Sequence, residues 1–355
     1  MIQKKDKSIL VFRFSALGDI AMTIPVLRSF FNTYPNQKIT FVSRGFVEPL
    51  FKEFDNLEFV SVDFNNDYKG LKGLFKLFKL LRKKNIKAVA DLHNVLRTKI
   101  LKIFFKLVFI KVQSIDKGRA DRKKLTQKNN KKFKPLTPIH YRYCDVFGRL
   151  GFPIDLTNHE YPIKPFLPEN SEEQKILSKS EDKKIIGIAP FASFTGKNYP
   201  LDLMQNVIAY LQKDHIIYLF GGGENELKQI KVWENAYDNV TDIASTFNLT
   251  EQINIISYID LMISMDSANG HIAANYGVPV LTIWGMTHPF CGFTPFDQGI
   301  ENSIMIDRNL YPQIPTSVFG NKIPKGYESA FRSVEPKEVI EKALEILNLA
   351  KPRHN

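Results

Sequence analysis

Cysteine and long apolar runs are scarce in this 355-residue sequence, and each absence excludes a class of protein. The two cysteines, Cys144 and Cys291, lie far apart and lack metal-site spacing, so we expect free thiols in a reducing cytoplasm rather than a disulfide framework. No run of 18 or more uncharged apolar residues occurs, so no membrane-spanning helix is predicted. Residues 1–7 contain no apolar signal-peptide core, which favours a cytoplasmic protein.

Acidic residues are scarce in one part of the chain. Residues 69–134 contain 22 Lys or Arg residues but three Asp or Glu residues. Residues 1–165 carry a formal charge of +19 and residues 166–355 carry −7, which together give the net +12. A field of this kind attracts an anionic partner, such as nucleic acid, an acidic lipid surface or a phosphorylated sugar.

Short apolar runs alternate with amphipathic segments along the whole chain, which is typical of a parallel α/β sheet. With 44% apolar residues, a chain of this length favours two domains over one core. Prolines at 162, 165 and 168 mark the boundary between them. We predict a basic Rossmann-like domain over 1–165, a linker over 166–183, a second Rossmann-like domain over 184–333, and a terminal helix within 334–355.

The most informative segment runs from Met265 to Val280, between two apolar runs that we interpret as buried strands. Asp266 stands where the first strand becomes a helix, and ligands of open α/β sheets bind at such carboxyl ends of strands. A helix N-terminus there offers N–H groups to a phosphate. Asp266, Ser267 and His271 are therefore candidates for an anion site. The alternative is an N-cap pair, Asp and Ser, with an incidental histidine one turn later.

A second segment of this kind lies near the N-terminus. Residues 9–14 form a strand-like run, Ser15-Ala-Leu-Gly-Asp19 follows it, and an apolar helix continues to Phe31. Asp19 is placed in the loop after the strand, at the carboxyl edge of the first sheet. It can serve as a general base there or as an N-cap of the helix, and the two roles are compatible.

Five motifs occur in the order typical of one known family. They are Ser15–Asp19, Asp91-Leu92-His93 with Arg97, Lys197-Asn-Tyr-Pro200, Phe220-Gly-Gly-Gly-Glu224, and Asp266-Ser-x-x-Gly-His-x-Ala-Ala-x-x-Gly-Val-Pro279. Together they cover about residues 9–295, and in this order the chain resembles the heptosyltransferase family, glycosyltransferase family 9. Two departures stand out: Tyr199 replaces the usual Trp, and Ala268 stands where the family often has Gly. That methyl is tolerated if φ is negative.

The resemblance implies two domains of the glycosyltransferase-B type facing across a cleft, with the terminal helix packing back toward the first domain. It implies inverting transfer of heptose from ADP-heptose to the lipopolysaccharide inner core, that is, to Kdo or heptose on lipid A. Such an enzyme works as a peripheral protein on the inner face of the cytoplasmic membrane of a Gram-negative bacterium. The basic first domain agrees independently, because this acceptor is anionic and lipid-linked.

Residue roles follow from the same resemblance, with Asp19 as the catalytic base. The predicted donor-binding residues are Ser193, Lys197, Gly222, Glu224, Asp266, Ser267, Ala268 and His271. The predicted acceptor-binding residues are Ser15, Gly18, His93, Arg97, Arg119, Arg122 and Lys123. No cofactor is expected besides the nucleotide-sugar substrate, and no metal, because the sequence contains no Asp-x-Asp.

Several of these assignments have open alternatives. Lys197 is a loop lysine of a kind that is normally solvated. Glu224 can hold a ribose hydroxyl or cap its helix, and Glu226 competes for the first role. His271 can donate to a phosphate or pack beneath its helix. Arg97 can clamp a carboxylate or phosphate, or form a surface salt bridge.

Two basic apolar segments, 73–84 and 100–109, have helical spacing. Core packing with a solvated lysine face is the favoured interpretation, and a helix lying on a membrane surface is the alternative. Residues 116–135 lose apolar periodicity, so an irregular basic loop is expected there.

Two other functions fit part of the sequence. A nucleotide-sugar epimerase shares the two-domain build but does not need so basic a half. A nucleic-acid-binding module explains the positive charge, but no aromatic and basic recognition motif is present, since the basic loop has Phe133 alone among its lysines. We therefore expect no nucleic-acid partner.

Overall fold

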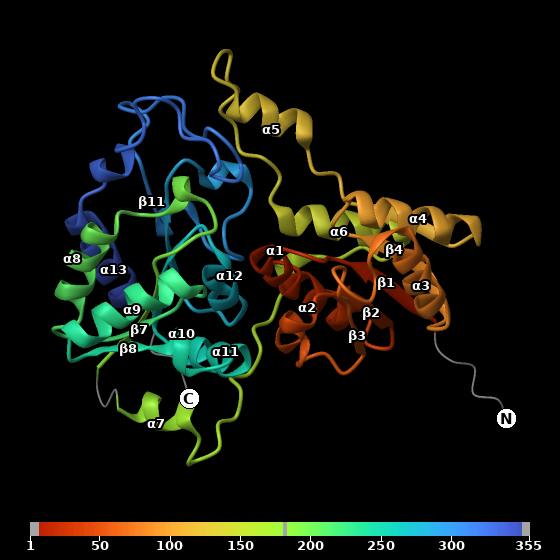
Figure 1. The fold of residues 1–355 in the computed structure, drawn as a ribbon, viewed down its shortest axis with the longest axis horizontal. Coiled ribbons are helices and arrows are strands. Elements are labelled where there is room, and N and C mark those ends of the chain that lie inside the picture. Colours follow the sequence, from red (N-terminus) through yellow and green to blue (C-terminus); the bar gives the residue numbers. More distant parts are fainter. Residues whose placement is uncertain (1–6, 180–182, 350–355) are drawn as a thin grey trace. The chain divides into compact units, whose positions relative to one another are not determined.

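The computed structural model describes residues 7–179 and 183–349, which divide into two compact units. Unit 1 consists of residues up to 117 together with 139–160, and unit 2 of 118–138 together with residues from 161 onward. Each unit is a parallel β-sheet covered by helices (Figure 1). The predicted α/β class with two Rossmann-like sheets is confirmed. Among the described residues, no helix is long and apolar enough to cross a membrane.

Unit 1 is built on five parallel strands in the order β3-β2-β1-β4-β5. Their bounds are β1 (Ser8–Phe12), β2 (Lys38–Ser43), β3 (Leu57–Ser61), β4 (Ile86–Asp91) and β5 (Lys111–Ser114). In the centre of the sheet Phe12 lies opposite Asp91, so β1 and β4 end side by side. The segments after these two strands carry the first predicted site, whereas β5 was not predicted.

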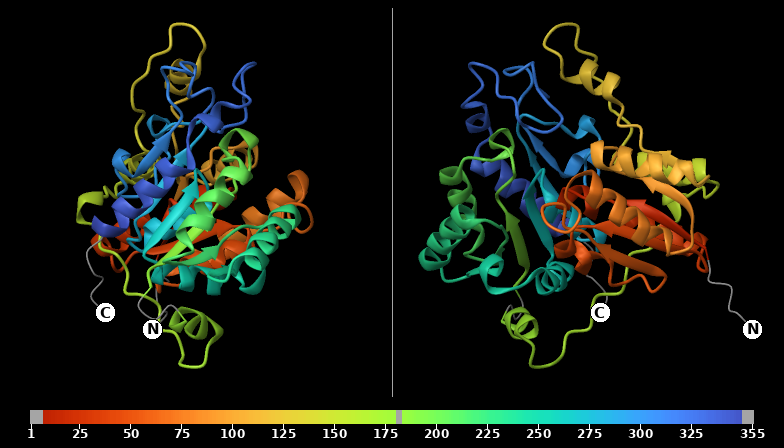
Figure 2. Two further views of the ribbon diagram at one scale, coloured as in Figure 1. Left: turned by 90° about the vertical axis from the view of Figure 1, so that its left-hand side faces the viewer. Right: turned by 45° about the vertical axis from the view of Figure 1, so that its right-hand side comes forward.

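Helices cover the two faces of this sheet. One face carries α2 (Ile24–Thr33) and α6 (Ile139–Leu150), whose Phe30 and Phe147 rings lie 5.2 Å apart. The other carries α3 (Gly70–Arg82) and α4 (Leu96–Leu107), which lie side by side (Figure 2). Along β1, Leu10 and Phe12 point into the α3–α4 core, as the period of two in a strand requires.

Unit 2 has six parallel strands in the order β11-β10-β9-β6-β7-β8. Their bounds are β6 (Ile185–Ala189), β7 (Ile216–Leu219), β8 (Val240–Asp242), β9 (Leu261–Met265), β10 (Val280–Trp284) and β11 (Ser303–Met305). The helices are α7 (Glu172–Ser178), α8 (Leu201–Leu211), α9 (Glu224–Ala236), α10 (Ile243–Thr246), α11 (Leu249–Tyr258), α12 (Ala268–Asn275) and α13 (Pro336–Leu349). The strand β11 is the one in this unit that the sequence did not predict.

The unit boundaries differ from the predicted ones at two places. The chain passes into unit 2 after Glu160, and part of the expected linker is the helix α7, whose Ile176 carbonyl accepts a hydrogen bond from Tyr218 (2.7 Å). The terminal helix α13 was expected to pack toward the first domain. Its apolar face, including Val339, Ala343 and Leu347, is buried in the core of unit 2 against α8, β9 and β10, and its packing toward the first domain stays a prediction.

The expected irregular loop at 116–135 contains a helix, α5 (Arg119–Thr126), and packs within unit 2. Leu125 of α5 is fully buried with Cys291 and Val318. Half-buried Lys131 donates to the carbonyls of Gln313 (2.6 Å) and Pro315 (2.7 Å). One buried leucine and one bound ammonium fix this segment, although it shows little apolar periodicity. Cys144 and Cys291 are free and buried, as the sequence predicted.

Candidate active site

Asp19 lies at the carboxyl edge of the unit 1 sheet, shortly after β1. It is in the first turn of the short helix α1 (Leu17–Ala21), not in an open loop as predicted. Its Oδ2 accepts the backbone N–H of Ala16 at 3.4 Å, while 28% of its side chain stays exposed. Ala16, not Asp19, is thus the N-cap residue, and Asp19 caps its N–H from the third helical position while its carboxylate stays accessible.

Arg13 forms an ion pair with Asp19 and was not predicted from the sequence. It is buried at the end of β1, and its Nη1 donates to the Leu92 carbonyl at 2.9 Å. Burial opposes the charge of this guanidinium, but the neighbouring Tyr143 and Asp19 outweigh it, so the Arg13 pKa is raised. The sequence signal that could have revealed this residue was an arginine directly after an apolar strand. The Arg13 guanidinium fixes the direction in which the Asp19 carboxylate points.

His93 follows β4 and is brought next to the Asp19 segment. Its Nδ1 accepts the backbone N–H of Phe14 at 3.3 Å, which leaves Nε2 as the protonated ring nitrogen. Burial and the charge of Arg13 lower the His93 pKa to about 3, so the ring is neutral at physiological pH. His93, one of the predicted acceptor-binding residues, is therefore a neutral hydrogen-bond donor at this edge of the sheet.

Asp91, at the end of β4, is a buried structural residue of the same edge. Its Oδ1 accepts the backbone N–H groups of His93 (3.0 Å) and Asn94 (2.8 Å), and Lys102 lies 2.8 Å from Oδ2. These contacts shape the turn that carries His93. Without a partner, a buried carboxylate here would be costly, so Lys102 belongs to the framework of the site.

The remaining predicted acceptor residues of unit 1 differ in their surroundings. Ser15, between β1 and α1, and Gly18, in the first turn of α1, are both half-buried. Arg97 is exposed at the start of α4, and its guanidinium lies 4.9 Å from the centre of the Phe64 ring. Within the described ranges no salt bridge of Arg97 is found, so that alternative is not supported, and its outward N–H groups remain available to an anion.

Lys197 and Asp266 form the centre of the polar edge in unit 2. The Lys197 Nζ lies 2.7 Å from Asp266 Oδ2 and 3.1 Å from the Asp266 carbonyl oxygen. The two side chains are 15% and 5% exposed. Lys197, predicted to bind the donor, is therefore paired with a buried carboxylate and is not the freely solvated lysine of the alternative. Its stem packs on Gly320, where φ is +73° and a Cβ would lie 2.5 Å from the lysine side chain.

The helix α12 begins directly after this pair. Ser267 is its N-cap residue by position, but its side chain makes no capping hydrogen bond and lies 3.1 Å from Ser264 Oγ. Ser267 therefore occupies the N-cap position, but its side chain does not cap the helix. Ala268 has helical backbone, which satisfies the condition for a methyl at that position. His271 is buried, which favours packing over direct contact with a ligand.

The glycine-rich turn after β7 carries the remaining predicted donor residues except Ser193, which is exposed in the loop before Lys197. The N–H of Gly222 donates to Glu226 Oε2 at 2.9 Å. Glu224 instead points into solvent and pairs with Lys228 at 2.6 Å. The structure thus places Glu226, not Glu224, at the turn. Gly221 approaches Phe191 closely, since a Cβ would lie 3.2 Å from its ring.

Three predicted acceptor residues lie on α5, and therefore in unit 2 rather than in the first domain. Arg119 and Lys123 are exposed. Arg122 is half-buried, with its guanidinium 5.0 Å from the Phe293 ring centre. The predicted assignment of these residues to the first domain is wrong, because Leu125 anchors their helix in the second.

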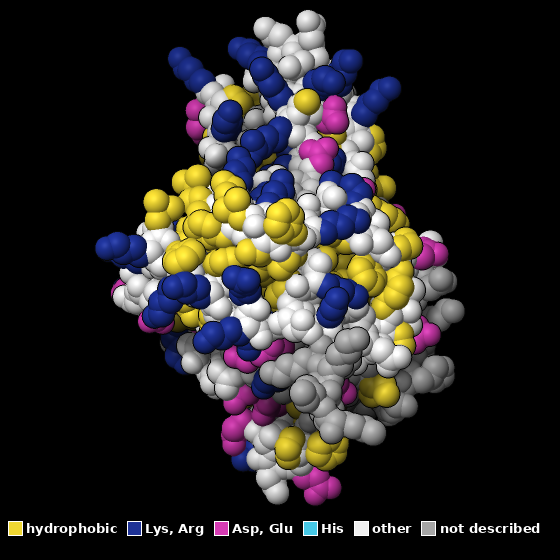
Figure 3. Space-filling model, turned by 90° about the vertical axis from the view of Figure 1, so that its right-hand side faces the viewer, with side chains coloured by type: hydrophobic (Ala, Val, Ile, Leu, Met, Phe, Trp, Pro, Cys, Tyr) yellow, Lys and Arg dark blue, Asp and Glu magenta, His cyan; other side chains and the backbone are white. Residues whose placement is uncertain are grey.

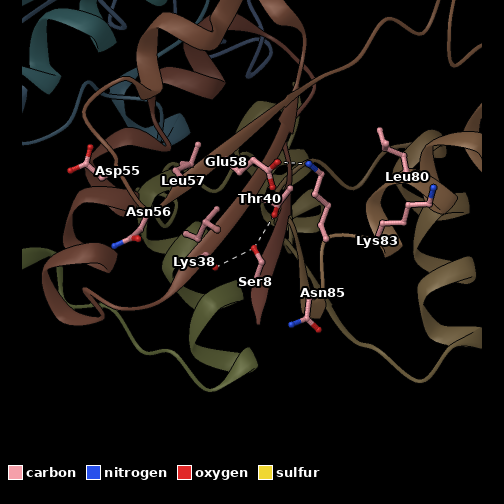
Figure 4. A pocket seen from close by; sticks show the side chains of 12 residues that line it. Ser8, Lys38, Thr40, Asp55, Asn56, Leu57, Glu58, Leu80, Lys83 and Asn85 are labelled. Carbon is pink, nitrogen blue, oxygen red and sulfur yellow. Dashed lines mark hydrogen bonds and ion pairs between the residues drawn. The ribbon is translucent and has the colours of Figure 1, made fainter. Parts of the chain in front are cut away.

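A pocket of about 770 Å³ opens at the opposite, amino end of the unit 1 strands (Figure 4). Ser8, Lys38, Glu58 and Lys84 are among its lining residues, and Lys84 pairs with Glu58. None of the predicted site residues lines it. In the described parts of the chain, no three His, Cys, Asp or Glu side chains are grouped so that they could hold a metal ion.

Two parallel-sheet units with charged sites at their carboxyl edges are the architecture of glycosyltransferases of the B type. The sequence matches the family model of glycosyltransferase family 9 (heptosyltransferase) over residues 74–323, and the chain belongs to that family. It is 25% identical to the lipopolysaccharide core heptosyltransferase OpsX of Haemophilus influenzae, over 80% of each chain.

Solved structures show the same fold. A glycosyltransferase family 9 protein of Veillonella parvula matches with a TM-score of 0.74 and 18% identity, over 98% of this chain and 99% of that one. The ADP-heptose lipopolysaccharide heptosyltransferase II of E. coli matches with a TM-score of 0.66 and 17% identity, over 97% and 99%.

Proposed function

We propose that this protein transfers heptose from ADP-heptose to the inner core of a lipopolysaccharide acceptor, with inversion at the anomeric carbon. Membership of the heptosyltransferase family supports the reaction class. The observation that carries the mechanism is the accessible Asp19 carboxylate, held by buried Arg13 at a sheet edge.

Asp19 acts as the general base. Its carboxylate takes the proton of the acceptor hydroxyl as that oxygen attacks the anomeric carbon. The bond from that carbon to the diphosphate oxygen breaks in the same displacement, and ADP leaves with the bonding electron pair. Arg13 and the Ala16 N–H hold the carboxylate in one orientation. The neutral Nε2–H of His93 donates a hydrogen bond to the acceptor.

Lys197 and the start of α12 offset the charge of the departing diphosphate. The backbone N–H groups of the first turn and the positive helix end favour an anion there. Asp266 keeps the lysine beside the helix start, at 2.7 Å. This electrostatic stabilisation replaces a bound metal ion, so we propose a metal-independent reaction.

The nucleoside part of the donor is held at the glycine-rich turn. Gly221 and Gly222 let a ligand approach the backbone, and Glu226 already accepts the Gly222 N–H at 2.9 Å. A carboxylate in this place can also accept a ribose hydroxyl. The ring of Phe191, stacked 6.3 Å from Trp233, borders the same turn.

The acceptor side is basic, which suits a phosphorylated, lipid-linked saccharide. Arg97, Arg119 and Lys123 are exposed cations available to its phosphates and carboxylates. We propose that the enzyme works as a peripheral protein on the cytoplasmic face of the inner membrane, where this acceptor is assembled.

Incubation of the protein with ADP-heptose and Kdo-lipid A, followed by mass spectrometry of the lipid, tests the proposal. Heptose addition with release of ADP is expected, and it should continue when a chelator is present. Free heptose or an epimerised nucleotide sugar without an acceptor would instead identify an epimerase. Inhibition by the chelator that magnesium reverses would contradict the metal-independent mechanism.

A further inference from the structure

The helix α4 of unit 1 is apolar on two opposite faces. Thr98, Leu101 and Phe105 point inward and are buried. Leu96, Ile103 and Leu107, spaced at i, i+7 and i+11, form an exposed outward stripe. Leu96 is 74% exposed and Leu107 is 71% exposed, so the core does not use this stripe.

Neighbouring residues extend this stripe into a patch. On α3, the side chains of Leu71 and Phe75 are exposed, and Phe75 contacts Phe104 of α4 edge-to-face at 5.6 Å. Phe109, directly after α4, is 98% exposed. Figure 3 shows hydrophobic side chains gathered on the face of the molecule that includes these helices, with Lys and Arg around them. Contiguous apolar patches of this kind mark interaction surfaces.

The charge around the patch is of one sign. Residues 69–111 contain thirteen Lys or Arg residues and a single acid, Asp91, which is buried and paired with Lys102. The helices α3 and α4 themselves contain no Asp or Glu. Exposed lysines at 72, 76, 79, 99 and 106 flank the apolar stripe. The core-packing interpretation of these segments therefore explains one face of each helix and leaves the other unexplained.

We propose that the α3–α4 face is a docking surface for an anionic lipid bilayer, with the apolar stripe in the acyl region and the lysines at the headgroups. Apolar residues between basic ones are what an interfacial helix presents to acidic lipid. A second copy of the chain is disfavoured, because a twofold contact through this face would bring two all-positive surfaces together.

The stripe begins at the catalytic edge of its own unit. Leu96 follows His93 by three residues, and Arg97 is next to Leu96 in the first turn of α4. A bilayer on this face would present its headgroups near the residues assigned to the acceptor. In this respect the inference rests on the proposed function, since it supplies the lipid-linked acceptor with a place to approach.

Binding to vesicles tests the assignment directly. Phosphatidylcholine vesicles with and without phosphatidylglycerol are mixed with the full-length protein and sedimented. The variant L96Q/I103Q/L107Q should lower the partition coefficient by about tenfold or more. The matched variant I163Q/V232Q/L310Q changes three exposed aliphatic side chains of unit 2 and should bind like the wild type. Equal thermal unfolding of the two variants excludes misfolding.

Charge is tested separately with K72Q/K79Q/K99Q/K106Q. Binding to anionic vesicles should weaken by about fivefold for each lysine that lies at the membrane surface, and this loss should be smaller in high salt. Binding to vesicles of phosphatidylcholine alone should not change. The α5 variant R119Q/R122Q/K123Q/K124Q should keep its vesicle binding. If the α5 variant loses binding and the α3–α4 variants retain it, the assignment is wrong.

Two further measurements separate this inference from the proposed function. Transfer to a deacylated acceptor fragment should be unchanged in the stripe variant, since no lipid is involved. If the wild-type protein transfers heptose but does not bind anionic vesicles, the docking surface is wrong and the proposed function still holds. A wild-type dimer in analytical ultracentrifugation that L96Q/I103Q/L107Q dissociates, with vesicle binding unaltered, would show a self-association surface instead.

Discussion

The polar edges of the two sheets use opposite arrangements of an ion pair. In unit 1 the cation, Arg13, is buried and the carboxylate, Asp19, is 28% exposed. In unit 2 the carboxylate, Asp266, is the more buried partner at 5%, and the cation, Lys197, is the more accessible at 15%. Each unit thus presents one charge to a ligand and uses its buried counter-ion to hold that charge in place.

This difference matches the two halves of a sugar transfer. The acceptor hydroxyl needs a group that takes a proton, and the leaving diphosphate needs positive charge. In this proposal the more buried member of each pair, Arg13 or Asp266, is a positioning residue, because it contacts the charged group that acts on the substrate rather than the substrate itself. The comparison therefore agrees with the proposal that unit 1 removes the proton and unit 2 stabilises the leaving group.

The largest effect is expected for Asp19→Asn, which removes the accessible carboxylate of unit 1. Asn keeps the size and an oxygen for the Ala16 N–H, so fold and ADP-heptose affinity should persist, while thermal stability should fall because buried Arg13 loses its counter-ion. The kcat should fall by about two to four orders of magnitude, as for a positioned general base. Steady-state kinetics and donor titration measure the two quantities.

A control at the same position separates chemistry from capping. Asp19→Ala should cost similar activity and additionally up to about 1–2 kcal/mol of stability, because the hydrogen bond at the helix start is lost. Transfer by the Asn variant at near the wild-type rate would show that the base lies elsewhere.

Removal of the accessible cation of unit 2 should have the next largest effect. Lys197→Ala should lower kcat by about 100-fold through lost stabilisation of the leaving group. It also leaves buried Asp266 without its partner, so thermal stability should fall. The double variant K197A/D266A should recover stability but not turnover. Recovery of both would mean that Lys197 is a structural residue.

His93 in unit 1 and His288 in unit 2 both have lowered pKa values, which predicts a loss of stability in acid. The pKa of His93 is lowered to about 3 and that of His288 to about 4, with burial as the main cause in both. In the unfolded chain these groups protonate below about pH 6.5, so stability is present above that pH and declines as the pH falls.

The size of this loss at pH 5 is about 2 kcal/mol for each histidine. His288→Asn can retain an acceptor for the Phe290 N–H, which His288 Nδ1 now binds at 3.0 Å, and removes one of the two titrating groups. Its unfolding temperature should therefore depend less steeply on pH between 7 and 5 than that of the wild type. An unchanged slope would show that His288 is not neutral in the folded state.

The basic helix α5 tests the division between the units, because its cations belong to unit 2 but were assigned to the acceptor. R119Q/R122Q/K123Q/K124Q should raise the KM for the lipid-linked acceptor by about tenfold and flatten its salt dependence. The KM for ADP-heptose should hardly change. A larger effect on the donor would assign α5 to nucleotide binding and leave acceptor recognition to unit 1 alone.

The sequence predicted both sheets and the position of each polar edge, since apolar runs and the motifs beside them are local features. Asp19 and Asp266 were found because each follows a strand within a few residues. Their partners were harder to pair: Arg13 was overlooked, and Lys197 was assigned to the donor site without its pairing to Asp266. Ion pairs such as Lys197 with Asp266 join residues 69 positions apart, which no local pattern reveals.

The same limit explains the errors outside the site. The segment 118–138 has little periodicity, yet Leu125 and Lys131 anchor it on unit 2. The apolar stripe of α13 can be recognised in the sequence, but the stripe does not show which element it packs against. Its position against α8 is set by tertiary packing. For α4, the sequence favoured core packing, and the exposure of Leu96 and Leu107 reveals a second apolar face.

The smallest expected effect distinguishes two glutamates of the glycine-rich turn in unit 2. Glu226 accepts the Gly222 N–H, whereas Glu224 pairs with Lys228 on the surface. Glu226→Gln should weaken ADP binding about fivefold, the worth of one charge-assisted hydrogen bond of about 1 kcal/mol. Glu224→Gln should leave it unchanged, because an exposed pair contributes little. Isothermal titration with ADP compares them. A selective loss in the Glu224 variant would mean that this side chain leaves Lys228 for the ribose, and that donor binding rearranges the turn.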